Sequence, residues 1–190
     1  MGEWFTSFDD AWSSFLARTE PLETFFDEFP DDPSSFAEGW LIVPPPEIKH
    51  EARRLQAELA GIPELVAVPE HFFHVWLRGE HGPDLEPLLE LGRFSLSLPR
   101  LNCFHTAVVA EVDSEGVEQL DTPDTFLPHL SLAYVRGPLA AHPVREALVP
   151  FRELSLGTFI VEELVRVRLP VGRTTVLQPW TVVERASLRR

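Results

Sequence analysis

The sequence contains little cysteine, few basic residues and no long apolar run. A single cysteine, Cys103, among 190 residues excludes an internal disulfide, a CxxC redox pair and a cysteine zinc site. This usage predicts a cytoplasmic protein, and the acidic, aromatic N-terminus is unlike a signal or transit peptide. No apolar run approaches the roughly 20 residues of a membrane span, so no membrane partner is expected.

Acidic residues outnumber basic ones almost two to one. The 16 Lys and Arg against 30 Asp and Glu give a formal net charge of −14. An extended nucleic-acid footprint needs a basic face and is therefore not expected. Residues 1–40 hold ten of the acidic residues and only one basic residue, Arg18. A local basic pocket for a small anionic substrate remains compatible with the rest of the chain.

Several common motifs are also missing. The chain has no GxxxxGK[ST], GxGxxG, HExxH or GxSxG. Phosphate-loop, dinucleotide-binding, zincin and nucleophile-elbow chemistries therefore lack their usual sequence signal. No cofactor is expected.

The remaining patterns predict an α+β fold with an antiparallel sheet and a few helices. Helical spacing of Phe8, Trp12, Phe15 and Leu16 follows a plausible N-cap, Ser7, and a Pro-, Asp- and Ser-rich break comes near residue 30. We therefore divide the chain into an acidic helical appendage (1–35) and a main domain (36–190). The main domain is expected to hold strands at 39–43, 71–79, 94–98, 104–112, 126–135, 157–171 and 175–188, and helices at 47–62, 85–93, 114–120 and 142–151.

Two stretches place a histidine and a second side chain on one face of a predicted strand. In FLPHLSLAYV (126–135), His129 and Ser131 point the same way. In VPEHFFHVWLRGE (68–80), His74 and Trp76 have the same relation, so HVWL parallels HLSL. Taken singly, either pair also fits the half-exposed face of an antiparallel sheet. A metal site at Glu70, His71 and His74 would need a helix there, which the Phe, Val and Trp content disfavours.

Two such strands side by side would bring two imidazoles into one cleft. Histidine titrates near neutrality, so one ring can hold a proton while the other lacks it. This is the requirement of general acid–base catalysis at a phosphate ester, and a neighbouring hydroxyl such as that of Ser131 can hold a phosphate oxygen. The arrangement requires no metal.

These two motifs resemble those of the two-histidine (2H) phosphoesterases, which carry two H-x-[T/S] motifs on bilobal antiparallel sheets with helices packed outside. The branch that is most similar is that of the bacterial 2′-5′ RNA ligase-like proteins, also called RNA 2′,3′-cyclic phosphodiesterases. The resemblance covers roughly residues 38–188 and includes the strand–helix opening GWLIVPPPEIKHEARRLQAEL. It implies His74 and His129 as catalytic residues and Ser131 as a phosphate ligand.

The chain departs from that pattern in two ways. Trp76 stands where the family has Thr or Ser, so its indole is either a base-stacking group or a wall of the cleft. The two histidines are only 55 positions apart. Arg78 either neutralises phosphate or is a solvated charge, and Tyr134 either contacts a nucleoside or packs in the sheet. Four further histidines without a partner pattern are expected at the surface: His50, His81, His105 and His142.

The expected function is hydrolysis of a 2′,3′-cyclic phosphate, or of a 2′-5′ linkage, in a small nucleotide or RNA terminus. One alternative is a nucleotide- or RNA-end-binding module in which Trp76 has ended catalysis; another is an acidic structural partner protein. The large apolar residues of 1–35 predict that this segment packs against the main domain or a second copy. If its acidic side lies near the cleft it would favour small substrates; otherwise it is a structural cap.

Overall fold

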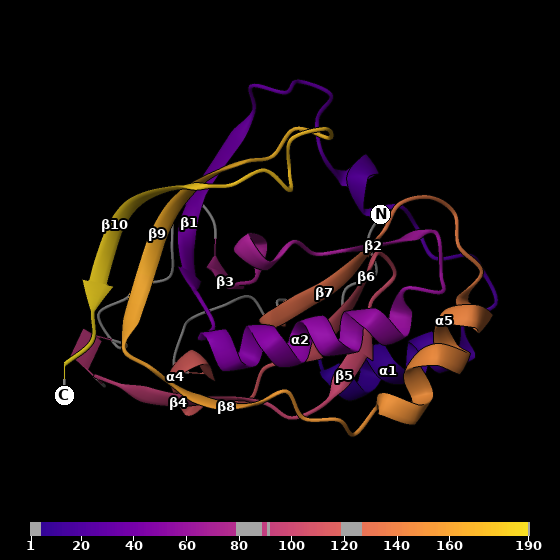
Figure 1. Cartoon of the computed structure of the whole chain (residues 1–190), viewed down its shortest axis with the longest axis horizontal. Helices are drawn as coiled ribbons and strands as arrows, with labels where there is room; N and C mark the ends of the chain where they lie inside the picture. The colour runs from indigo at the N-terminus through magenta and orange to yellow at the C-terminus, as the bar shows by residue number, and fades with distance from the viewer. Residues whose placement is uncertain (1–4, 79–88, 91, 119–126, 190) are drawn as a thin grey trace.

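The computed structural model describes residues 5–78, 89–90, 92–118 and 127–189. Its helices are α1 (Phe8–Ala17), α2 (Pro46–Leu59), α4 (Glu115–Glu118) and α5 (Ala141–Leu148), with 3-10 helices at Phe25–Glu28, Glu70–Phe72 and Val149–Phe151. Its strands are β1 (Phe36–Ile42), β2 (Leu65–Ala67), β3 (Val75–Arg78), β4 (Phe94–Leu98), β5 (Leu101–Cys103), β6 (Ala107–Glu111), β7 (His129–Val135), β8 (Gly157–Val161), β9 (Glu163–Pro170) and β10 (Thr181–Ser187). Figure 1 shows their arrangement.

The main sheet consists of two halves that meet at a narrow seam. Among the described residues its order is β10-β9-β1-β3-β7-β6-β5, with β2 pairing on β7, and every pairing is antiparallel. The seam between β3 and β7 has one registered pair, Val75 with Leu130. Strands β4 and β8 form a separate two-stranded sheet. The expected α+β fold with antiparallel sheets is confirmed.

Helix α2 covers one face of the sheet at β7 (Figure 1). Pro46 is the first residue of the helix, where a backbone N–H would have no partner within the helix, so the missing N–H of proline costs no hydrogen bond. The helix buries Ile48, Ala52, Leu55 and Leu59, which recur at helical spacing. The Gln56 amide donates to the carbonyls of Val68 (2.9 Å) and Leu132 (2.7 Å). This face is therefore closed, and the opposite face of β7 is left for the site.

The N-terminal segment packs against the main domain, which confirms that expectation. Ser7 caps α1, its hydroxyl accepting from the Asp10 amide at 3.1 Å. Phe15 and Leu22 are 3% and 1% exposed and belong to the same core as the sheet. Each such side chain stabilises the fold by about 1.5–3 kcal/mol. The division of the chain at residue 35 remains a prediction.

Two strands start at least four residues later than the sequence predicts. The strand expected from residue 71 starts at Val75, because Glu70–Phe72 form a 3-10 helix directly after Pro69. The strand expected from residue 175 starts at Thr181, because residues 173–177 form turns. Short-range β propensity is overridden in both places by local turn formation.

Other differences concern short or divided strands. The run expected at 157–171 forms β8 and β9, which belong to different sheets. Strands β2 and β5 lie where the sequence predicts none. The strand expected from residue 104 begins at Ala107, after a bend. The helix expected at 85–93 lies largely outside the described residues, as does the end of that expected at 114–120.

In the described part of the chain, no helix combines the length and apolar character that a membrane crossing requires.

Candidate active site

The seam between β3 and β7 brings the two predicted motifs together. Val75 and Leu130 are paired and both fully buried on the α2 side of the sheet. Side chains alternate along a strand, so His74 and His129, each one position away, face the opposite side. Both histidines line one cleft there.

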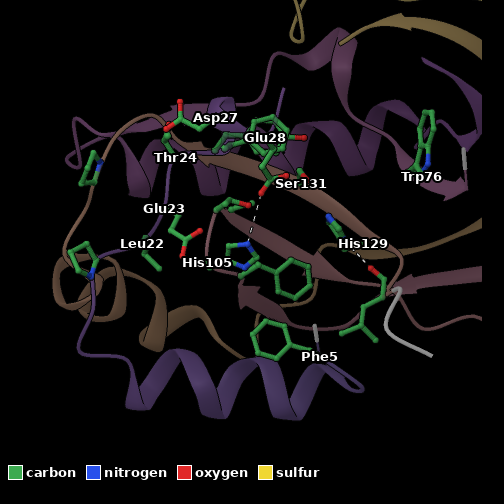
Figure 2. A pocket seen from close by; sticks show the side chains of 18 of the residues that line it. Phe5, Leu22, Glu23, Thr24, Asp27, Glu28, Trp76, His105, His129 and Ser131 are labelled. Atoms are coloured by element: carbon green, nitrogen blue, oxygen red, sulfur yellow. Dashed lines mark hydrogen bonds and ion pairs between the residues drawn. The ribbon is translucent and has the colours of Figure 1, made fainter. Parts of the chain in front are cut away.

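The cleft has a volume of about 1020 Å³ and brings together segments distant in sequence (Figure 2). Its walls come from the two histidine motifs, from the turn before β6 and from the N-terminal segment. The residues that line it are Phe5, Pro21, Leu22, Glu23, Thr24, Phe25, Asp27, Glu28, His74, Trp76, Phe104, His105, Thr106, Ala107, Leu127, His129, Ser131, Tyr134 and Pro138.

The two imidazoles are held in the same way. Nδ1 of His74 lies 2.6 Å from the Phe72 carbonyl oxygen, and Nδ1 of His129 lies 2.7 Å from that of Leu127. A carbonyl only accepts, so each Nδ1 is the donor, and the lone pair of each neutral ring is on Nε2. Neither Nε2 has a protein hydrogen-bond partner in the described structure. Each ring therefore offers Nε2 for proton transfer.

Burial lowers the pKa of both imidazoles. The pKa of His74 falls from 6.5 to about 4, mainly through burial; the bond to Phe72 opposes the fall and the charge of His129 adds to it. Burial also lowers the pKa of His129, against the opposing effect of its bond to Leu127. Because the charge of one ring disfavours that of the other, the pair holds at most one proton readily. Without an anion, both rings are neutral at pH 7.

Aromatic rings surround each imidazole edge-on. Phe104 lies 4.9 Å from His129 between ring centroids, at an interplanar angle of 88°. Trp180 lies 5.4 Å from His74 at 89°, and Phe72 lies 5.0 Å away at 84°. Trp180 comes from the segment before β10, for which sequence reasoning gives no functional signal. These rings displace water around the imidazoles and account for much of their desolvation.

Ser131 and Tyr134 lie on the cleft side of β7. A side-chain hydrogen bond with Ser131 acts to lower the pKa of Tyr134, but burial is the larger effect and raises it to about 12. The Tyr134 ring is 5% exposed and stacks on Phe25 at 3.6 Å and 8°. Its face is thus occupied by Phe25, and its side-chain hydrogen bond is to Ser131. The serine hydroxyl lies in the cleft, as the motif predicts.

Trp76 lines the cleft beside His74, at 6.1 Å between ring centroids. It is half-buried, so the indole neither fills the core nor leaves the site. The backbone of Arg78 continues β3 and pairs with Trp40. The side chain of Arg78 lies outside the described residues.

His105 was expected at the surface, and that expectation is wrong. The bend before β6 carries it into the cleft, where its side chain is only 15% exposed (Figure 2). Its Nε2 lies 3.8 Å from a Glu28 carboxylate oxygen, and its Nδ1 is buried without a hydrogen-bond partner. Burial raises the pKa of Glu28, an effect that His105 opposes. The contact joins residues that are 77 positions apart, so no local pattern announces it.

The described residues contain no group of three or more His, Cys, Asp or Glu side chains suited to hold a metal ion. Cys103 is buried in the core, and burial raises its pKa well above the usual thiol range.

Comparison with known proteins identifies the fold. No protein-family model and no curated protein sequence matches the chain. TT0787 of Thermus thermophilus is 20% identical with a TM-score of 0.57, over 80% of this chain and 98% of that one. A protein described as a phosphoesterase is 16% identical with a TM-score of 0.57, over 82% and 100%. E. coli LigT complexed with 3′-AMP is 18% identical with a TM-score of 0.58, over 84% and 100%.

These solved structures share their fold with the chain. The resemblance stated from the two motifs is therefore confirmed at the level of the fold. The identities are too low to carry over an activity.

Proposed function

We propose that the chain is a metal-independent phosphoesterase that hydrolyses the 2′,3′-cyclic phosphate, or a 2′-5′ linkage, of a nucleotide or RNA terminus. His74 and His129 share the acid and base roles, and Ser131 binds a phosphate oxygen. Arg78 and Trp76 are proposed to contact the substrate, and Tyr134 to orient Ser131.

The observation that carries this proposal is the matched pair of histidines in one cleft. Each donates from Nδ1 to a backbone carbonyl two residues before it, and each leaves Nε2 facing the cleft side of the sheet. Such a bond fixes the tautomer and the orientation of the ring. The fold neighbours described as a phosphoesterase and as LigT with 3′-AMP support the same chemistry.

The reaction needs two proton transfers and one displacement at phosphorus. A neutral imidazole takes a proton from water at Nε2 as the water oxygen bonds to phosphorus. The bond from phosphorus to one ribose oxygen breaks, and the other imidazole, which is protonated at the start, gives its proton to that oxygen. The cyclic phosphate thereby opens to a phosphomonoester. Because the pKa of both histidines is lowered, a neutral imidazole is available as the base. The negative charge of the bound phosphate favours a proton on the other imidazole, which then acts as the acid.

Substitution of the two histidines tests the proposal. We expect His74→Ala and His129→Ala each to lower turnover of nucleoside 2′,3′-cyclic phosphates by about 100-fold or more, the usual share of general acid–base catalysis. The double variant should fall little further, because the residues act as a unit. His142→Ala, at a side chain 70% exposed on α5, is the matched control. Unchanged turnover in the double variant would sink the assignment.

A nucleotide- or RNA-end-binding module is the second candidate, and Trp76 is the observation in its favour. An indole N–H donates once and cannot replace a hydroxyl that both donates and accepts. If this side chain has ended catalysis, calorimetry should detect 3′-AMP binding without hydrolysis of the cyclic phosphate. Trp76→Thr should then create measurable turnover, whereas an active wild-type protein eliminates this candidate.

We also propose that the protein acts in the cytoplasm, a location supported by its single, buried thiol. Fractionation of cells expressing the chain tests it, and recovery in a membrane or secreted fraction would refute it.

A further inference from the structure

The N-terminal segment Pro21–Glu28 forms a fixed wall of the cleft. All of its residues except Phe26 line the cavity. Leu22 and Leu139 exchange backbone hydrogen bonds of 2.7 and 3.3 Å. The Glu23 amide donates to the His105 carbonyl at 2.8 Å, so the backbone is tied down at consecutive residues.

The next residues of the segment are also attached. The Thr24 hydroxyl donates to the Val135 carbonyl at 3.3 Å, and Phe25 stacks on Tyr134. A wall held by backbone bonds, a hydroxyl and a stacked ring does not swing away to admit a larger ligand without breaking these contacts. Figure 2 shows Glu23 and Glu28 close to His105, whereas Asp27 points away from it.

This wall is acidic. Glu23, Asp27 and Glu28 all line the cleft, and none of the described lining residues is Lys or Arg. The surrounding segment 18–35 holds six acidic residues and one basic residue. Negative charge on a fixed wall raises the energy of any additional anionic group in the cleft.

Some of these carboxylates form ion pairs, which weaken the repulsion of an anionic ligand without removing it. Asp27 lies 2.8 Å from Arg173, and Glu23 lies 3.6 Å from Arg18. Glu28 lies 3.8 Å from His105 and is also hydrogen-bonded by the Thr106 side chain. Arg18 and Arg173, which offset Glu23 and Asp27, are not among the lining residues, whereas Glu23 and Asp27 are.

We propose that this acidic wall makes the site selective for a ligand with a single phosphate, a cyclic mononucleotide, against an RNA strand. The inference rests on the proposed function and narrows its substrate class. The scissile phosphate would lie at His74, His129 and Ser131. The further phosphates of a strand that occupies the rest of the cleft would lie close to Glu23 or Glu28, where like charges repel in a partly desolvated site. Glu23 and Glu28 are thus specificity-determining residues.

The test compares adenosine 2′,3′-cyclic phosphate with a hexaribonucleotide that ends in a 2′,3′-cyclic phosphate. We expect wild-type protein at low salt to favour the mononucleotide by at least tenfold in kcat/KM. The double variant Glu23→Gln, Glu28→Gln should reduce this ratio about tenfold, and added salt should reduce it in the wild type by screening. The variant Glu58→Gln, Glu153→Gln changes net charge equally at exposed positions outside the cleft and should keep the wild-type ratio.

Binding separates this inference from the proposed function. The same comparison is made by titration with 3′-AMP and with a hexamer carrying a 3′-phosphate. Discrimination in binding without hydrolysis supports the acidic wall and refutes the enzyme. The inference would be overturned if the wild type hydrolysed or bound the mononucleotide and the hexamer equally well, or bound neither. It would also be overturned if the two double variants changed the ratio of mononucleotide to hexamer to the same extent.

Discussion

Acidification should destabilise the protein through His74. Its pKa is about 4 in the folded chain and has the ordinary value of 6.5 when unfolded. Between these values the unfolded chain binds a proton that the folded chain does not, so the free energy of unfolding falls as the pH falls. The full gap corresponds to roughly 3 kcal/mol, at 1.36 kcal/mol for each pKa unit.

About 2 kcal/mol of that total is expressed between pH 7 and pH 5 according to the linkage relation. His74 is only half-buried because its ring borders the open cleft, and solvent reduces the effect. We therefore expect His74 to contribute about 1–2 kcal/mol to the loss of stability over this interval. Glu28, whose pKa is raised, works in the opposite sense, since folding favours its protonated form as the pH falls.

Urea unfolding at pH 5, 6, 7 and 8, followed by tryptophan fluorescence, measures this contribution. His74→Asn keeps a donor for the Phe72 carbonyl but does not titrate. Subtracting the variant's free energy of unfolding from that of the wild type at each pH therefore removes the contributions of Glu28 and the other titrating groups. The profile of the variant should be flatter by about 1–2 kcal/mol between pH 7 and pH 5. His142→Asn, at an exposed site, should retain the wild-type profile. If His74→Asn and the wild type lose the same stability, the ring is not desolvated as the structure implies.

Three further outcomes are expected. A p-nitrophenyl phosphodiester needs no protonation of its leaving group, so it should restore turnover to His129→Ala but not to His74→Ala; equal behaviour of the two variants would contradict a division of roles. Turnover of a cyclic mononucleotide should be unchanged after incubation with EDTA and removal of bound ions by gel filtration; a loss restored by a divalent metal would contradict a metal-independent mechanism. Deletion of residues 1–35 removes the buried Phe15 and Leu22 and should lower stability by at least about 3 kcal/mol in urea unfolding; an equally stable truncated protein would contradict the packing described here.

The sequence predicts the centre of this site because its signal there is local. A period of two places His129 and Ser131 on one face of β7, and the HVWL pattern identifies His74 and Trp76 without any contact information. The antiparallel α+β fold follows similarly from short apolar runs and the strand–helix opening. These features depend on residues a few positions apart.

The walls of the cleft are not predictable in that way. His105 contacts Glu28, and Leu22 contacts Leu139, across 77 and 117 positions of the sequence. Trp180 reaches His74 only because turns delay the start of β10. No single-sequence period records such contacts. The acidic composition of the N-terminus is visible in the sequence, but its position on the cleft becomes visible only in the fold.

The two histidines share one local geometry but have different surroundings, and we expect that difference to divide their proposed roles. His74 lies among three aromatic rings, those of Phe72, Trp76 and Trp180, whereas His129 has one ring contact among the described residues, with Phe104. Repulsion between the two positive charges acts on both rings, so it limits the pair to one proton without deciding which ring holds it. When a phosphate anion brings one proton to the pair, we expect that proton on His129. His74 would then take the proton of water and His129 would protonate the leaving ribose oxygen, which is the division of roles that the p-nitrophenyl ester tests.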